Sequence, residues 1–113
     1  MRTLFLILAF CLIPLSATAQ QLAGQEVFEI LTAKTRHFSG GSVSDFKRDG
    51  TFVTTHSNGV REEGTYRITK GGLVKVDDRA TGTKYTFTVQ QGDGTYLFTY
   101  RSGPGRGKTY SFK

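Results

Sequence analysis

Glycine-containing turns divide the sequence from Phe38 to the C-terminus into short segments in which apolar and polar residues alternate. Alternation in segments rich in Thr, Tyr, Phe and Val is typical of antiparallel strands with one buried face. The turns fall at Asp49-Gly50, Asn58-Gly59, Gly71-Gly72, Thr81-Gly82, Gly92-Asp93 and Gly103 to Gly107. Six turns predict seven strands, at about residues 42–47, 51–56, 60–69, 73–78, 83–91, 94–102 and 107–112.

The first three turns have the form of three-residue loops that end in a left-handed glycine. With such loops, Phe52 lies opposite both Phe46 and Gly64, and Ile68 lies opposite Val74. Residues that face each other in an antiparallel pair share one side of the sheet, and a slip of one residue would turn every side chain over. The turn type therefore predicts which side chains share a face.

The later turns are predicted in the same way. A four-residue loop at 79–82 pairs Val76 with Tyr85. A two-residue turn at Gly92-Asp93 pairs Phe87 with Phe98, and a loop at 104–106 then places Tyr110 opposite Tyr100.

This register places the large apolar side chains on one continuous face. They are Phe46, Phe52, Tyr66, Ile68, Val74, Val76, Tyr85, Phe87, Val89, Tyr96, Phe98, Tyr100, Tyr110 and Phe112. The opposite face carries mostly Thr, Ser, Lys and Arg. A sheet with one apolar face has to bury it, so we expect a mainly β fold: a seven-stranded antiparallel meander that forms a curled sheet or a small up-and-down barrel.

One segment before the strands has helical spacing. Ala23, Val27, Ile30 and Leu31 fall at positions i, i+4, i+7 and i+8, which predicts a short amphipathic helix at about 24–34. We expect this N-terminal helix to close one end of the barrel or to cover its open side.

The first nineteen residues have the features of a cleaved secretory signal peptide. Arg2 supplies a positive start, residues 4–15 form an apolar run, and Ala17-Thr18-Ala19 has the small residues of a cleavage site. A membrane-spanning helix needs about 20 apolar residues, and this run is shorter. We therefore expect a single domain of residues 20–113 that is periplasmic or secreted. The chain would contact the membrane only through the signal peptide before cleavage.

Composition excludes several kinds of site. The chain has 113 residues, a net charge of +6 and one cysteine. That cysteine, Cys11, leaves with the signal peptide, so the domain has neither a disulfide nor a cysteine nucleophile. His37 and His56 have no metal-ligand spacing. We expect no metal, no cofactor and a monomer, and the export signal argues against nucleic acid as a partner.

Sequence motifs also argue against an enzyme. The stretch from Gly103 to Thr109 has the composition of a phosphate-binding loop, but Ser102 stands where the motif needs glycine and no helix can follow. There is no Gly-x-Ser-x-Gly nucleophile elbow. Neighbouring acids such as Glu62 and Glu63 point to opposite faces of a strand. We therefore predict no catalytic residues.

Polar residues on the core face are the candidate binding residues. The register places His56 diagonally from Glu62, about 7 to 8 Å between alpha carbons, either as a ligand-binding pair at the rim or as a solvated hairpin tip. The hydroxyls of buried tyrosines need partners, so they either line a partly wet cavity or reach the barrel ends. The tyrosines concerned are Tyr85, Tyr96, Tyr100 and Tyr110.

Basic residues near the C-terminus form a second candidate site. Arg101, Arg106 and Lys108 lie close in sequence to Tyr100 and Tyr110, and basic side chains beside aromatic ones suit an anionic polymer. The alternative is an ordinary solvated loop.

Three segments resemble a known group of proteins. They are the helix Leu22 to Thr32, Asp49-Gly50-Thr51-Phe52 and Gly64-Thr65-Tyr66-Arg67-Ile68. Together they resemble small exported proteobacterial β-sheet domains of unknown function, which pair a leading helix with such hairpins. The resemblance implies a fold and no activity.

The function predicted from the sequence is that of an exported, non-enzymatic binding module. Its ligand would be a small molecule, an envelope polymer or a protein partner. The alternative is an inhibitor of an extracellular or periplasmic hydrolase, which would act through the loop from Ser102 to Gly107.

Overall fold

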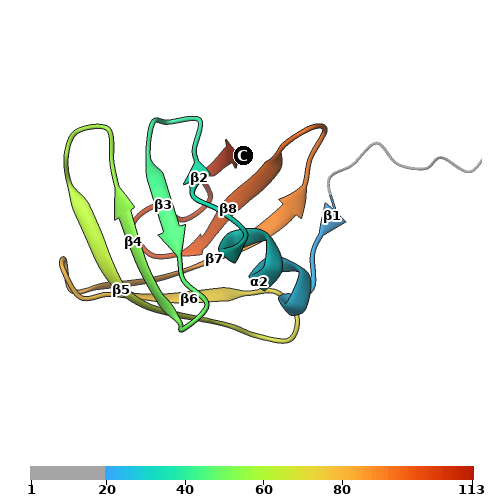
Figure 1. The fold of residues 1–113 in the computed structure, drawn as a ribbon, viewed down its shortest axis with the longest axis horizontal. Helices are drawn as coiled ribbons and strands as arrows, with labels where there is room; N and C mark the ends of the chain where they lie inside the picture. Colours follow the sequence, from blue (N-terminus) through green and yellow to red (C-terminus); the bar gives the residue numbers. More distant parts are fainter. Residues whose placement is uncertain (1–19) are drawn as a thin grey trace, which may run out of the picture.

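The computed structural model describes residues 20–113, and the predicted signal peptide lies outside this range. One helix and a nearly closed barrel of eight antiparallel strands make up the fold (Figure 1). In chain order the elements are β1 (Gln20–Gln21), α2 (Gly24–Thr32), β2 (Arg36–His37), β3 (Val43–Phe46), β4 (Thr51–Thr55), β5 (Arg61–Ile68), β6 (Val74–Asp78), β7 (Thr83–Gln91), β8 (Tyr96–Ser102) and β9 (Thr109–Phe112). The predicted fold class is confirmed.

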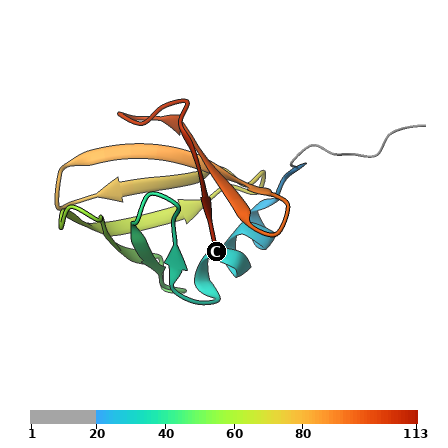
Figure 2. The same ribbon diagram turned by 90° about the horizontal axis from the view of Figure 1, so that it is seen from above.

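The barrel is a meander whose two ends meet. Strands β2 to β9 pair in sequence order, and the short β1 pairs with the end of β7. His37 and Lys113 exchange two backbone hydrogen bonds of 3.0 Å, and Phe38 forms a bridge with Phe112. The C-terminus therefore lies beside β2 (Figures 1 and 2). Strands β1 and β2 were not among the seven predicted, which correspond to β3 to β9.

The first three predicted hairpins are confirmed in register. Phe52 pairs with both Phe46 and Gly64, and Ile68 pairs with Val74. The loops end in Gly50, Gly59 and Gly72, whose φ angles of 91°, 91° and 98° lie in the region that glycine adopts without steric cost. The four-residue loop between β6 and β7 is also confirmed, because Asp78 pairs with Thr83.

The pairing predicted for the last two hairpins is wrong by two residues. Phe87 pairs with Tyr100 instead of Phe98, and Phe98 pairs with Tyr110. Gly92 donates a backbone hydrogen bond to Thr95, so the first of these turns lies one residue later than predicted. Moving a turn by one residue moves the pairing by two, and the side chains keep their face.

The apolar face forms the core as predicted. Eleven buried hydrophobic residues form one cluster, and partly buried side chains that include Tyr85, Tyr96 and Tyr100 pack against it. The helix adds Val27 and Leu31, which are fully buried. It ends at Thr32, two residues before the predicted end, and Arg36 holds its C-terminus by donating from Nε to the Ile30 carbonyl at 2.9 Å.

The meander topology gives the barrel two distinct ends. Because successive turns alternate between ends, the turns at 48–50 and 70–72 lie at the end where α2 packs, and Gly24 of the helix donates to the Lys70 carbonyl. The turns at 39–41, 57–59, 79–82 and 103–107 lie at the other end. Among residues 20–113, no helix has the length and apolar character needed to cross a membrane.

Candidate ligand-binding cavity

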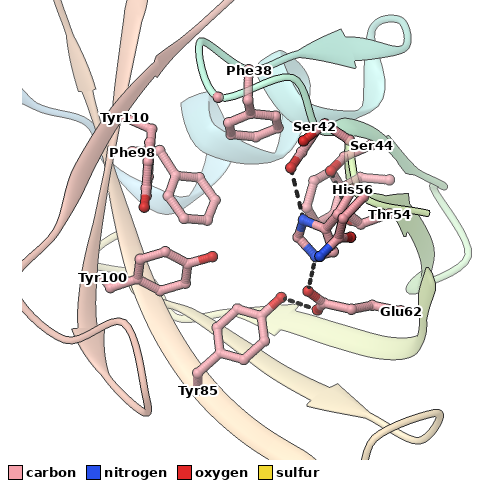
Figure 3. Close-up of a pocket in the computed structure, with 14 residues that line it drawn as sticks. Phe38, Ser42, Ser44, Thr54, His56, Glu62, Tyr85, Phe98, Tyr100 and Tyr110 are labelled. Atoms are coloured by element: carbon pink, nitrogen blue, oxygen red, sulfur yellow. Dashed lines mark hydrogen bonds and ion pairs between the residues drawn. The ribbon is translucent and has the colours of Figure 1, made fainter. Parts of the chain in front are cut away.

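A cavity of about 260 Å³ lies in the barrel at the end opposite the helix (Figure 3). Polar side chains line one side of it, and aromatic rings line the other. Its lining residues are Phe38, Gly40, Ser42, Ser44, Phe46, Thr54, His56, Ser57, Asn58, Glu62, Tyr85, Phe98, Tyr100 and Tyr110. Gly40, Ser57 and Asn58 are exposed, so they mark the mouth.

The strand register builds the polar side. The pairing of β3 with β4 places Ser44 opposite Thr54. Two residues further along, just beyond the two strands, Ser42 lies beside His56. Hydroxyls of Ser44 and Thr54 are hydrogen-bonded at 2.7 Å, and Ser42 Oγ lies 2.7 Å from His56 Nδ1. Two cross-strand pairs therefore face the cavity as a hydrogen-bonded layer.

Glu62 connects this layer to the aromatic side. Thr54 pairs with Glu62, which makes His56 and Glu62 diagonal neighbours, as predicted. His56 Nε2 is 2.5 Å from Glu62 Oε2, and the Tyr85 hydroxyl donates to Oε1 at 2.8 Å. The pairing of β5 with β6 ends at Gly64, which lies opposite Asp78. Glu62 therefore has no β6 residue opposite it, and the ring of Tyr85 on β7 can reach its carboxylate.

The hydrogen bonds assign the proton positions of His56. An ionised carboxylate only accepts hydrogen bonds, so Nε2 carries the hydrogen that is donated to Glu62. In the neutral imidazole Nδ1 is then an acceptor, and the Ser42 hydroxyl donates to it; in the imidazolium Nδ1 donates to the Ser42 oxygen instead. In both forms His56 donates to Glu62 and is hydrogen-bonded to Ser42.

Aromatic rings at steep angles to one another form the opposite side. Phe38 and Phe98 lie edge to face, with centroids 5.2 Å apart and an interplanar angle of 90°. Tyr100 makes angles of 76° with Phe98, 63° with Tyr85 and 88° with Tyr110. The cavity is therefore bordered by ring faces and edges in several orientations.

Burial keeps two of the phenols protonated. It raises the pKa of Tyr85 far above its usual value, and the neighbouring Glu62 charge and hydrogen bond raise it further. Burial, followed by the charge of Glu62, raises the pKa of Tyr100 to about 12. Within residues 20–113, the hydroxyls of Tyr100 and Tyr110 have no hydrogen-bond partner, and that of Tyr100 points into the cavity (Figure 3).

Five of the nine predicted site residues meet in this cavity: His56, Glu62, Tyr85, Tyr100 and Tyr110. Tyr96 does not line it. Tyr96 packs on Phe112 near the helix, where the guanidinium of Arg36 lies 5.5 Å from its ring centroid.

The predicted basic residues lie outside the cavity. Arg101 donates to the Thr88 hydroxyl at 2.9 Å, while Arg106 and Lys108 are exposed in the loop between β8 and β9. Lys108 borders an adjoining depression that shares Glu62, Tyr85, Tyr100 and Tyr110 with the cavity. Lys108 therefore lies beside the aromatic candidates, whereas Arg101 and Arg106 line neither the cavity nor this depression.

Sequence reasoning missed the contribution of β2 and the loop that follows it. Phe38 and Ser42 flank the turn Ser39-Gly40-Gly41, which has the same three-residue form as the predicted hairpins, with a φ of 97° at Gly41. The signal was present in the sequence as Gly40-Gly41. It was overlooked because β2 has two residues and shows no alternation.

Few charged residues line the cavity. Among the described residues, Glu62 is the only acidic residue that lines it, His56 is the only side chain of the lining that can carry a positive charge, and no Lys or Arg lines it. No group of three or more His, Cys, Asp or Glu side chains that could hold a metal ion occurs within the described residues.

Comparisons with family models, curated proteins and solved structures give no match for this chain.

Proposed function

We propose that the protein is an exported, non-enzymatic binding module that holds a small ligand in the cavity at the open end of the barrel. The observation that carries the proposal is the Tyr100 hydroxyl, which points into the cavity without a protein partner, opposite the hydrogen-bonded layer of His56 and Glu62. No buried side-chain polar atom among residues 20–113 lacks a partner, so the Tyr100 hydroxyl is open to the cavity and is free to hydrogen-bond a ligand.

The dimensions and lining of the cavity agree with this proposal. Ligand sites are typically concave and largely apolar, with a few placed polar groups, and those for drug-sized molecules have volumes of about 300 to 1,000 Å³. A cavity of about 260 Å³ suits a smaller molecule. One ring and a short polar group would fit between the aromatic and polar sides.

The geometry favours binding over hydrolysis. Ser42, His56 and Glu62 are residue types that occur in hydrolytic triads, in which serine contacts Nε2 and the acid contacts Nδ1. Here serine contacts Nδ1 and the acid contacts Nε2. We therefore assign these residues to ligand recognition.

The structure of the loop between β8 and β9 favours a role in forming the cavity over a role as an inhibitory segment. Arg106 donates to the Gly103 carbonyl and Lys108 donates to that of Gly105, so the loop is a series of tight turns. A Cβ atom at Gly105 would lie 2.9 Å from the Tyr100 ring. The loop therefore packs on a residue that lines the cavity and does not present an extended inhibitory segment.

The proposal is tested by blocking the mouth. A Cβ atom at Gly40 would lie 3.8 Å from the Tyr110 ring, an ordinary contact, so Gly40→Leu should fold and fill the entrance. Gly71 has the same middle position in the turn at the opposite end, and a Cβ atom there meets nothing within 4 Å. Gly71→Leu is therefore the matched control.

The measurement is an NMR titration of the purified protein with benzylammonium, benzyl alcohol and benzoate. We expect at least one of these probes to shift the signals of His56 and Tyr100 in the parent and in Gly71→Leu. Gly40→Leu should weaken that binding by about tenfold or more. If none of the three probes binds, or if Gly40→Leu leaves binding unchanged, the proposal is wrong.

A further inference from the structure

We infer that the ligand of this cavity is a small organic cation with N–H groups, such as a protonated amine carrying an aromatic or aliphatic body. This inference rests on the proposed function and specifies its ligand class. It follows from three properties of the lining: net charge, unused hydrogen-bonding capacity, and ring arrangement.

Charge is the first property. The side chain of Glu62 is 13% exposed, and the cavity supplies neither Lys nor Arg to balance it. When His56 is neutral, and with Tyr85 and Tyr100 protonated, the lining carries a net charge of −1. A carboxylate that is largely removed from water attracts a cation and repels a second anion, so a cation is favoured and a carboxylate or phosphate is opposed.

Hydrogen bonding is the second property. Most donors of the polar side are already used, because His56 Nε2 and the Tyr85 hydroxyl donate to Glu62, and His56 Nδ1 is hydrogen-bonded to Ser42. Each carboxylate oxygen accepts one of these bonds and retains further acceptor capacity, as does the Ser42 oxygen. The polar side therefore offers acceptors, and a complementary ligand has to bring donors.

The rings provide the third property. The negative faces of aromatic rings attract cations, and a group of rings at different orientations is a known recognition device for ammonium groups. Phe38, Phe98 and Tyr100 border the cavity at steep mutual angles. An ammonium group that contacts Glu62 would have aromatic surface beside it for its apolar body.

The test compares the affinities of three probes that share one ring. Benzylammonium, benzyl alcohol and benzoate differ in their charge, and the titrations are run at neutral pH and low ionic strength. We expect benzylammonium to bind about tenfold or more tightly than benzyl alcohol, and benzoate to bind most weakly. Equal affinities for benzylammonium and benzyl alcohol would overturn the inference while leaving the binding proposal intact, whereas no binding of any probe would overturn both.

A charge-removing variant identifies the residue responsible. Glu62→Gln should reduce the preference for benzylammonium over benzyl alcohol to within about twofold. Glu63→Gln, the next residue, is the matched control because its side chain is exposed and paired with Arg61, and it should retain the preference. If folded Glu62→Gln keeps the preference, the inference is wrong; if it does not fold, the probe comparison in the parent protein decides.

Discussion

At the scale of single residues, the cavity depends on the carboxylate of Glu62. The alternation pattern predicts only that this side chain points inward. Glu62 accepts hydrogen bonds from His56 and Tyr85, and its charge also acts on Tyr100. Burial is the main cause of the raised pKa of Tyr100, and this carboxylate on a different strand raises that pKa further.

This coupling predicts a loss of stability at alkaline pH. Tyrosine in an unfolded chain has a pKa of about 10, and the pKa of Tyr100 in the fold is raised to about 12. Above pH 10 the unfolded state releases the proton first, so stability falls as pH rises from 10 to 12. We expect Tyr100 to account for about 2 kcal/mol of this loss.

Denaturant unfolding between pH 9 and pH 12 measures the effect. The free energy of unfolding of Tyr100→Phe should decline less steeply than that of the parent over this range. Parallel pH profiles for the two proteins would show that Tyr100 titrates in the fold as it does in the unfolded chain.

At the scale of elements, the contact between β5 and β6 depends on Gly64. A Cβ atom there would collide with the backbone carbonyl of Asp77 and lie 3.1 Å from the amide nitrogen of Arg79. Backbone atoms cannot move aside without disturbing the pairing, so overpacking should cost about 1 to 3 kcal/mol. Gly64→Ala should therefore lower the free energy of unfolding by this amount, whereas Gly71→Ala should change it little.

Urea unfolding of the two variants makes the comparison. If Gly64→Ala were as stable as Gly71→Ala, the close approach of β5 and β6 at this point would be refuted.

The hairpins show which parts of the fold can be predicted from sequence. Loops that end in Gly50, Gly59 and Gly72 fix both face and register, because one loop length satisfies the pairing and places the glycine at positive φ. Between β7 and β8, the turn can move from Gly92 to Asp93 with every side chain still on its face. Alternation has a period of two residues, so it cannot detect a shift of two.

Turn geometry also decides which residues of the cavity could be predicted from the sequence. His56 and Glu62 belong to a hairpin whose register is fixed by its turn, and their proximity was predictable. Tyr96 was expected in the cavity, but the structure places it near Arg36 and Phe112. Ser42 lines the cavity from the turn between β2 and β3. This contribution was not predicted, because the two-residue β2 is too short to produce a periodic signal.

At the scale of the whole molecule, the meander separates stability from recognition. The helix places Val27 and Leu31 in the core at the end where the turns at 48–50 and 70–72 lie. The opposite end has no such element among the described residues, and there the inward positions carry Ser42, His56 and Glu62. Apolar packing at one end thus allows the other to keep polar groups around a cavity.

Closure of the barrel should be its least stable feature. The seam consists of few backbone hydrogen bonds, including those between His37 and Lys113 and from Ser39 to Ser111. Local opening is favoured where few buried contacts and hydrogen bonds have to be broken. We expect the amides of Ser39 and Lys113 to be protected from hydrogen exchange at least tenfold less than that of Tyr66, which donates to Gly50 within the continuous sheet.

Ligand binding should link this seam to the cavity, because Phe38 lines the cavity from one side of the seam and Tyr110 from the other. A ligand that contacts both favours the closed state and should slow exchange at Ser39. Hydrogen exchange measured by NMR with and without benzylammonium tests this, with Gly40→Leu as the control that should show no change. Equal protection at Ser39 and Tyr66 without ligand would mean that the barrel opens only as one cooperative unit, and the seam would then not be a separate site of local opening.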